Sequence, residues 1–322
     1  MEWKRLSGRY KNSKLKYYLK AIFRDRLQFL INVNKIQDLL NDPVLNDKSD
    51  LQKRIDYYNQ MNENSDLGKE AFPISDFRIG KKLKTYYFDL KQYTNYFPSH
   101  LKINTLFGDI CYVPEVPCIQ KSRPIQGDLS NAVVFPLNKI RHFLFIKNDK
   151  LSFTKKKDQL VWRAKIHPSQ PHRIAFAEKY YGHSLCNIGR VNNNDLDARW
   201  LKNRMTIGQQ LHYKFILCLE GNDVATNLKW VMSSNSIAVM PKPKYESWFM
   251  EGVLIPDVHY ICIKDDYSNL EEKLKTFIEN PSKAEKMLEA AHRHVVQFQD
   301  PKKEDYVALK VLEKYFKRSA QL

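Results

Sequence analysis

The sequence predicts an α/β protein with parallel sheets, divided into two domains. Beyond residue 100, apolar segments typical of strands alternate with amphipathic segments typical of helices, as βαβ units require. A length of 322 residues is enough for two domains, each with its own core. The hydrophobic content of 43% excludes a disordered or collagen-like chain. We found no internal repeat or low-complexity tract.

The net charge of +17 implies an anionic partner, which can be nucleic acid, a membrane surface or a phosphorylated substrate. No run of 18 apolar residues is present, and Met1–Arg5 precedes no apolar segment. We therefore expect neither a membrane span nor a secretory signal, and a cytoplasmic location. The cysteines are odd in number, scattered and without a C-x-x-C pair, which favours reduced core residues over disulfides or zinc ligands. They are Cys111, Cys118, Cys186, Cys218 and Cys262.

Residues 14–31 predict a basic amphipathic helix in an N-terminal domain spanning residues 1–150. This helix either packs its apolar side on the domain core or also touches an anionic membrane surface. The apolar side consists of Leu15, Tyr18, Leu19, Ile22 and Phe23.

An apolar segment from residue 101 ends at Gly108 and Asp109. A carboxylate just beyond a strand is where open α/β sheets place their ligand crevice, although Asp109 can equally cap a turn. A basic loop, Lys121-Ser122-Arg123-Pro124, follows. The charged segment 147–159 marks the boundary to a second domain of residues 151–300, and residues 301–322 form a final helix that packs back on the first domain.

The second domain begins with a strand around Trp162, a basic loop, a helix from about Gln170 and a strand over 184–189. Arg163 and Arg173 offer planar forks suited to phosphate oxygens, whereas Lys165 acts as a point charge.

Residues 212–241 predict a strand, a glycine turn, a helix over 224–235 and another strand. We expect Gly221 to adopt positive φ and Asn222 or Asp223 to cap the helix. The helix N-terminus then suits a phosphate, with Thr226 and Asn227 adding hydrogen bonds. A plain strand-to-helix corner is the alternative. The segment has too few glycines for a dinucleotide fingerprint and no P-loop lysine.

The remaining chain predicts a short helix between residue 247 and a strand over 259–263, and then a helix that opens on a Ser268–Glu271 capping box. Two amphipathic helices over 282–298 and 305–319 end the chain. Asp195 and Asp197 have the D-x-D spacing of metal-dependent sugar transferases, but they lie in an Asn-rich stretch typical of a loop. We expect no metal site.

Four segments, 103–125, 161–173, 212–240 and 247–274, occur in the order and spacing of glycosyltransferase family 90, which the chain resembles. The likeness is greatest to short bacterial members linked to lipopolysaccharide or capsule. It implies a GT-B architecture, with two Rossmann-like domains facing a cleft, and a nucleotide sugar held mainly by the C-terminal domain. It also implies inversion, no required metal and no cofactor.

By this resemblance, Asp109 matches the catalytic base, and the loop Lys121, Ser122 and Arg123 matches a donor contact. Lys165 and Arg173 fall where the family contacts the donor, after a strand that here ends in Trp162-Arg163-Ala164 with alanine in place of the usual glycine. Asn227 stands where eukaryotic members carry an arginine on the diphosphate, so UDP-glucose is not simply assumed. The loop expected to hold the diphosphate and sugar comprises Gly221, Asn222, Asp223, Val224, Ala225, Thr226 and Asn227.

The expected function is therefore a metal-independent inverting glycosyltransferase that uses a UDP-linked sugar. Its acceptor is a glycan or lipid-linked glycan such as lipopolysaccharide core or capsule, at the inner face of the cytoplasmic membrane. The alternative is a basic protein that binds nucleic acid or an anionic membrane without transferase activity. Nucleic-acid binding predicts clustered cations with stacking aromatics, whereas the basic residues here are spread along the chain.

Overall fold

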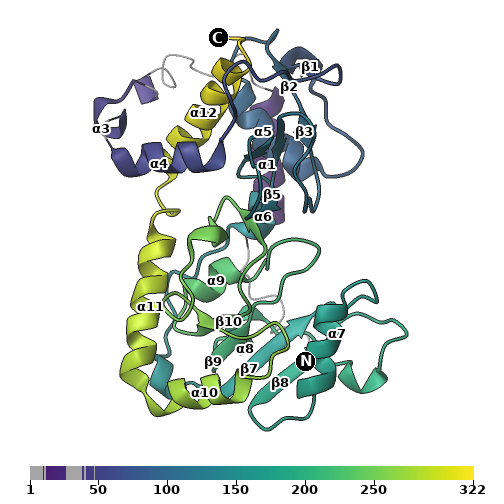
Figure 1. Cartoon of the computed structure of the whole chain (residues 1–322), viewed down its shortest axis with the longest axis vertical. Coiled ribbons are helices and arrows are strands. Elements are labelled where there is room, and N and C mark those ends of the chain that lie inside the picture. The colour runs from purple at the N-terminus through teal and green to yellow at the C-terminus, as the bar shows by residue number, and fades with distance from the viewer. Residues whose placement is uncertain (1–9, 11, 27–37, 40, 47) are drawn as a thin grey trace. The chain divides into compact units, whose positions relative to one another are not determined.

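The computed structural model describes residues 10, 12–26, 38–39, 41–46 and 48–322. The chain divides into two compact units (Figure 1). Unit 1 comprises residues 142–243 and 253–297 with Tyr10 and Asn12, and unit 2 comprises residues 13–141, 244–252 and 298–322. The chain crosses between the units after residues 12, 141, 243, 252 and 297, so each unit is assembled from separate stretches of sequence.

The described part of unit 1 contains a five-stranded parallel sheet in the order β12-β10-β9-β7-β8. The central strands β9 and β10 are buried at every residue, as expected for a parallel sheet covered on both faces. In Figure 1 α7 lies beside β8 and α10 lies next to α11. The strands are β7 Lys157–Ala164, β8 Cys186–Arg190, β9 Tyr213–Leu217, β10 Ile237–Met240 and β12 Ile261–Cys262; the helices are η5 Phe153–Lys155, α7 Pro171–Tyr180, η6 Ala198–Trp200, α8 Ile207–Gln210, α9 Leu228–Met232, α10 Leu270–Glu279 and α11 Pro281–Val296.

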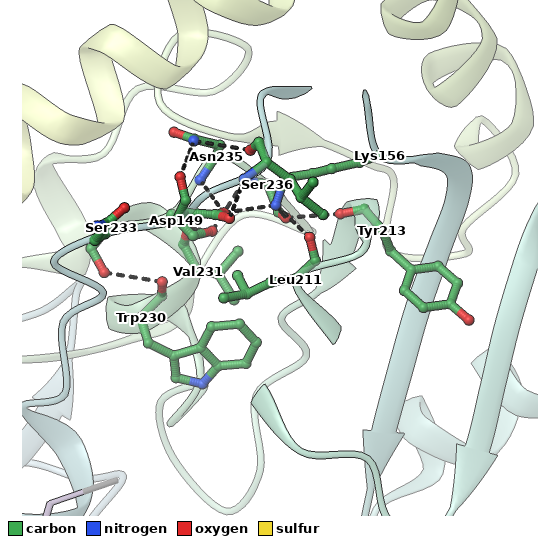
Figure 2. A network of polar contacts seen from close by, with 12 residues as sticks. Asp149, Lys156, Leu211, Tyr213, Trp230, Val231, Ser233, Asn235 and Ser236 are labelled. Carbon is green, nitrogen blue, oxygen red and sulfur yellow. Dashed lines mark hydrogen bonds and ion pairs between the residues drawn. The ribbon is translucent and has the colours of Figure 1, made fainter. Parts of the chain in front are cut away.

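A buried polar network joins the amino ends of three strands of this sheet (Figure 2). The ammonium of Lys156, just before β7, donates to Asp149 Oδ2 at 2.7 Å, to the backbone oxygen of Leu211 at 2.5 Å and to Ser236 Oγ at 2.9 Å. Leu211 precedes β9 and Ser236 precedes β10. Because all three ammonium protons are used inside the protein, this edge of the sheet is fixed by side chains.

Unit 2 contains a three-stranded parallel sheet, β3-β4-β6, and two antiparallel pairs, β1-β2 and β11-β5, in its described part. Helix α12 packs against α4 and α5, and α1 packs against α5. The strands are β1 Phe72–Pro73, β2 Lys102–Ile103, β3 Thr105–Leu106, β4 Cys118–Gln120, β5 Ser122–Pro124, β6 Ala132–Val134 and β11 Tyr245–Ser247; the helices are α1 Lys14–Arg26, α3 Pro43–Asn46, α4 Ser49–Tyr58, η4 Ile74–Asp76, α5 Lys84–Thr94, α6 Lys139–His142, η7 Glu251–Val253 (which ends at the start of the next unit 1 stretch) and α12 Pro301–Arg318.

The structure confirms a mixed α/β chain with parallel sheets and corrects several local predictions. Helix α9 covers only Leu228–Met232, and its N-cap is Asn227, so a cap at Asn222 or Asp223 is wrong. The prediction that Ser268 caps this helix is also wrong. The backbone N–H of Ser268 donates to Asp266 Oδ1, and α10 begins after its N-cap Asn269. The short helix predicted between residue 247 and the strand at 259 is present as the 3₁₀ helix η7 Glu251–Val253, whereas Ser247 itself ends β11.

All five cysteines are unpaired, and Cys118, Cys186 and Cys218 are buried as predicted, whereas Cys111 is exposed. The last residues of the predicted helix 14–31, from residue 27 on, lie outside the described residues. Among the described helices, none is both long and apolar enough to cross a bilayer.

Candidate functional site

In unit 2, Asp109 and Lys121 meet at the carboxyl edge of the parallel sheet. Asp109 lies shortly beyond β3, and Lys121 directly follows the neighbouring strand β4. The ammonium of Lys121 donates to Asp109 Oδ1 at 2.6 Å. The side chain of Lys121 is 2% exposed and that of Asp109 is 36% exposed. The carboxylate is therefore reachable from solvent while the buried ammonium of Lys121 holds it in place.

The turn that carries Asp109 is fixed by its neighbours. Gly108 adopts φ 133°, a conformation that side chains disfavour, so a glycine is needed there. Its carbonyl accepts from the Tyr86 hydroxyl at 3.3 Å. On the other side, Ser122 Oγ donates to the carbonyl of Ile110 at 3.1 Å. These contacts hold the carboxylate in one place.

Arg123, a predicted donor contact, is fully buried inside unit 2. Its guanidinium forms an ion pair with Glu246 at 2.8 Å and donates to the carbonyls of Ala132 at 2.9 Å and Tyr57 at 2.6 Å. Burial raises the pKa of the Glu246 carboxyl. The described contacts of Arg123 thus join β5, β11, β6 and α4, and its contact with a donor stays a prediction.

In unit 1, Arg173 connects two loops at the carboxyl edge of the five-stranded sheet. Its guanidinium donates to the carbonyls of Lys165 at 2.8 Å, Leu219 at 3.0 Å and Glu220 at 2.8 Å. Lys165 directly follows β7, and Leu219 and Glu220 follow β9, the adjacent strand. Burial lowers the pKa of Arg173 to about 10, so the side chain remains charged at neutral pH. The guanidinium group of Arg173 therefore fixes the loop that follows β9.

The loop 221–227 is also fixed by its glycine and by two amides. Gly221 lacks the positive φ that the sequence suggested, and a Cβ there would lie 3.3 Å from the Arg173 guanidinium, which would have to shift to accommodate it. Gln170 Nε2 donates to Asn222 Oδ1 at 3.2 Å, and Asn227 Nδ2 donates to the carbonyl of Leu217 at 2.9 Å. Of the other loop residues, Asp223, Val224 and Ala225 are buried and Thr226 is partly buried.

The two remaining predicted cations of unit 1 differ in exposure. Arg163 is partly buried and donates to the carbonyl of Asn187 at 2.9 Å and to its side-chain oxygen at 2.8 Å, which joins β7 to β8. Burial lowers the pKa of Arg163. Lys165 is exposed at the end of β7. Of these two cations, Lys165 has the side chain accessible to an anion.

The D-x-D segment has its own partner. Asp197 forms an ion pair with Arg199 at 2.6 Å and caps the turn Ala198–Trp200, and Arg199 lowers the pKa of its carboxyl. In the part of the chain that the structure describes, no group of three or more His, Cys, Asp or Glu side chains is placed to hold a metal ion.

The predicted residues thus form two clusters, Asp109 with Lys121 in unit 2 and Arg173 with the loop 221–227 in unit 1. Sequence analysis missed Gln170 as a contact of this loop and missed Lys121 as the partner of Asp109. No sequence pattern indicates Gln170, because its partner is distant in the chain. Lys121 could have been found from parallel pairing, since both residues follow neighbouring strands.

Comparison with known proteins shows the family to which the chain is similar. The model of glycosyl transferase family 90 matches residues 131–320. O-glucosyltransferase LpsA of Dichelobacter nodosus is 41% identical over 266 residues, which cover 83% of this chain and 82% of that protein. Uncharacterized protein 027R of Frog virus 3 (isolate Goorha) is 34% identical over 90 residues, covering 27% of this chain and 9% of that protein.

The chain is a glycosyltransferase. It belongs to glycosyltransferase family 90, as the sequence resemblance predicted. The matched region contains Arg173 and the loop 221–227, whereas Asp109 and Lys121 lie before it. Glycosyltransferases in general take a nucleotide-sugar donor and a glycan acceptor, so the two clusters can be assigned chemical roles.

Proposed function

We propose that the chain transfers a sugar from a UDP-linked donor to a hydroxyl of a cell-surface glycan precursor, with inversion and without a metal ion. Glucose is the first sugar to test, because the relative LpsA is named an O-glucosyltransferase. The name LpsA and the resemblance to bacterial lipopolysaccharide and capsule enzymes support a lipopolysaccharide core or capsule acceptor. A parallel sheet in each unit supports a GT-B architecture.

The observation that carries this proposal is the partly exposed Asp109 carboxylate, held at 2.6 Å by the buried ammonium of Lys121. Asp109 takes the proton of the acceptor hydroxyl as the hydroxyl oxygen bonds to the anomeric carbon. The bond from that carbon to the diphosphate breaks, and its electron pair leaves with the nucleoside diphosphate. A general base contributes about 10²–10⁴-fold to such a step.

The negative charge of the departing diphosphate must be balanced by the protein. We assign this to the exposed ammonium of Lys165 and to backbone N–H groups and side chains of the loop 221–227. Arg173 is a positioning residue, because its guanidinium donates to the carbonyl of Lys165 and to the carbonyl of Glu220, just before the loop 221–227. Its positive charge adds to the local field. Lys165, the loop 221–227 and Arg173 together stabilise the negative charge of the diphosphate, a role for which other glycosyltransferases use a divalent cation.

The donor is identified by titrating the purified protein with UDP-, GDP-, CMP- and TDP-sugars and following thermal unfolding with and without EDTA. A ligand at 100 times its Kd stabilises the native state by about 2.7 kcal/mol. We expect stabilisation by a UDP-sugar that EDTA does not change. Stabilisation only in the presence of Mn²⁺ would contradict a metal-independent mechanism.

The catalytic role is tested with Asp109→Asn. We expect turnover to fall by at least about 100-fold while the donor still stabilises the protein, because the amide cannot accept the proton. Asp128→Asn, at an exposed carboxylate of the same unit, is the matched control and should keep full activity. Near-normal turnover of Asp109→Asn would remove this residue from the mechanism. NMR of the product reports whether the anomeric configuration is inverted.

A further inference from the structure

Helix α1 turns its large apolar side chains toward solvent. Leu15 is 72% exposed, Leu19 60%, Ile22 41% and Phe23 68%. A helix on a domain surface normally buries such a stripe against the core. Of the predicted apolar side, only Tyr18 is partly buried, with its ring against Phe88 of α5, whereas these four residues face solvent.

Helix α1 is joined to α5 by the ring contact of Tyr18 with Phe88 and by polar side chains. The hydroxyl of Tyr17 donates to Asp89 Oδ1 of α5 at 2.8 Å and to the carbonyl of Thr85 at 3.2 Å. Asp25 accepts from the hydroxyl of Tyr87 at 3.1 Å. These polar contacts fix the rotation of the helix about its axis, so the outward apolar stripe is part of the folded arrangement.

A second element beside α1 has the same mixed chemistry. The loop 78–84, with the sequence RIGKKLK, is exposed at every residue, and Ile79 and Leu83 are each 46% exposed. Ile79 and Lys84 line, together with Ile22 of α1, one open hollow of about 510 Å³. The exposed face of α1 and the loop 78–84 therefore form one surface, which we call the basic-apolar surface.

Cations accompany the apolar residues on both elements. The helix contributes three exposed lysines and the loop contributes four basic side chains. They are Lys14, Lys16, Lys20, Arg78, Lys81, Lys82 and Lys84.

We infer that the basic-apolar surface docks this protein on a lipid bilayer that contains anionic lipids. Leucine, isoleucine and phenylalanine side chains on one face of a helix enter the boundary between headgroups and acyl chains. Lysine and arginine next to them pair with anionic headgroups, and the attraction is screened by salt. The net charge of +17 acts in the same direction. This inference does not rest on the sugar donor or on Asp109.

The test is co-sedimentation of the full chain with vesicles of phosphatidylcholine alone and of phosphatidylcholine mixed with phosphatidylglycerol. We expect binding to the mixed vesicles that decreases as salt increases. The double variant Leu19→Ser/Phe23→Ser should weaken the binding by about tenfold or more, because two bulky side chains no longer insert. Lys16→Gln/Lys20→Gln should weaken binding to the mixed vesicles selectively.

Matched controls separate the surface from bulk properties. Val296→Ser removes an apolar side chain that is 61% exposed on α11 of unit 1, and Lys283→Gln/Lys286→Gln removes two exposed charges from the same helix. Both controls should bind vesicles like the unchanged protein.

Three results would overturn the inference. The first is no binding to either vesicle, and the second is equal weakening by the α1 variants and the α11 controls. The third is self-association that Leu19→Ser/Phe23→Ser abolishes without any vesicle binding, because a second copy would then cover the surface. Turnover with a soluble acceptor, measured in parallel, should be the same in all variants, so failure here is distinguishable from failure of the proposed reaction.

Discussion

Replacing Arg173 with lysine separates a positioning role from a simple charge contact with the donor. The change keeps the positive charge but removes the planar fork that donates to the carbonyls of Lys165, Leu219 and Glu220. A lysine can keep one of these three charge-assisted hydrogen bonds. Two are lost, at about 1.5 kcal/mol each at the lower end of their range, or about 3 kcal/mol in total.

If the donor binds only the ordered loop 221–227, this loss appears in the donor affinity. Since about 1.4 kcal/mol is a factor of ten, we expect the Kd for the UDP-sugar to rise by between about 10- and 100-fold. Part of the loss lowers the thermal stability of the free protein instead. Calorimetric titration with the UDP-sugar measures the first effect, and thermal unfolding measures the second.

Arg199→Lys is the control, because Arg199 is an exposed arginine of the same unit that pairs with Asp197. It should change neither quantity appreciably. An unchanged Kd in Arg173→Lys, together with a large rise in Arg173→Ala, would refute the reasoning. The donor would then require only the charge at this position, and the contacts with the three carbonyls would be incidental to binding.

Two further predictions concern buried charges away from the two clusters. Lys156→Met leaves Asp149 buried without its ammonium, so the free energy of unfolding should fall by about 3–5 kcal/mol. Adding Asp149→Leu should restore part of it, and an unchanged midpoint of denaturant unfolding in the single variant would contradict the network. Burial raises the pKa of Asp89 to about 6, so its protonated form stabilises the native state below about pH 4. This stabilisation is lost as the pH rises to about 6, by about 3 kcal/mol in total. Asp89→Asn should remove this part of the pH dependence of the free energy of unfolding. If the free energy changes equally with pH in the variant and the unchanged protein, Asp89 does not titrate in this range.

The strands of the parallel sheet in unit 1 could be predicted because β7, β9 and β10 each contain a short buried apolar run, Leu160–Trp162, Phe215–Leu217 and Ile237–Met240. The position of Asp109 could be predicted from its place after an apolar segment. The helix over 224–235 was predicted too long because Val224 and Ala225 are apolar. They are buried by the packing of the loop rather than by a helix.

Other features depend on contacts between residues distant in the sequence. Arg173 binds carbonyls of Leu219 and Glu220, which no local pattern connects to it. The rotation of α1 about its own axis also depends on such a distant contact. Its spacing shows which side is apolar, but the side that packs is decided by Tyr17 and its partner Asp89 on α5.

The two edges of the sheet in unit 1 are held by different kinds of contact, and the difference determines which substitutions each edge tolerates. At the amino edge, Lys156 and Asp149 use their polar atoms on one another and on neighbouring backbone and serine groups, so substitutions there cost stability. At the carboxyl edge, Arg173 donates to the backbone carbonyls of Lys165, Leu219 and Glu220, which follow β7 and β9. The loop 221–227 is held in addition by the side-chain amides of Gln170, Asn222 and Asn227, so these positions contribute to its placement. Asn227, which by the resemblance stands where eukaryotic family members carry an arginine, is one of these positions, because its amide donates to the carbonyl at the end of β9.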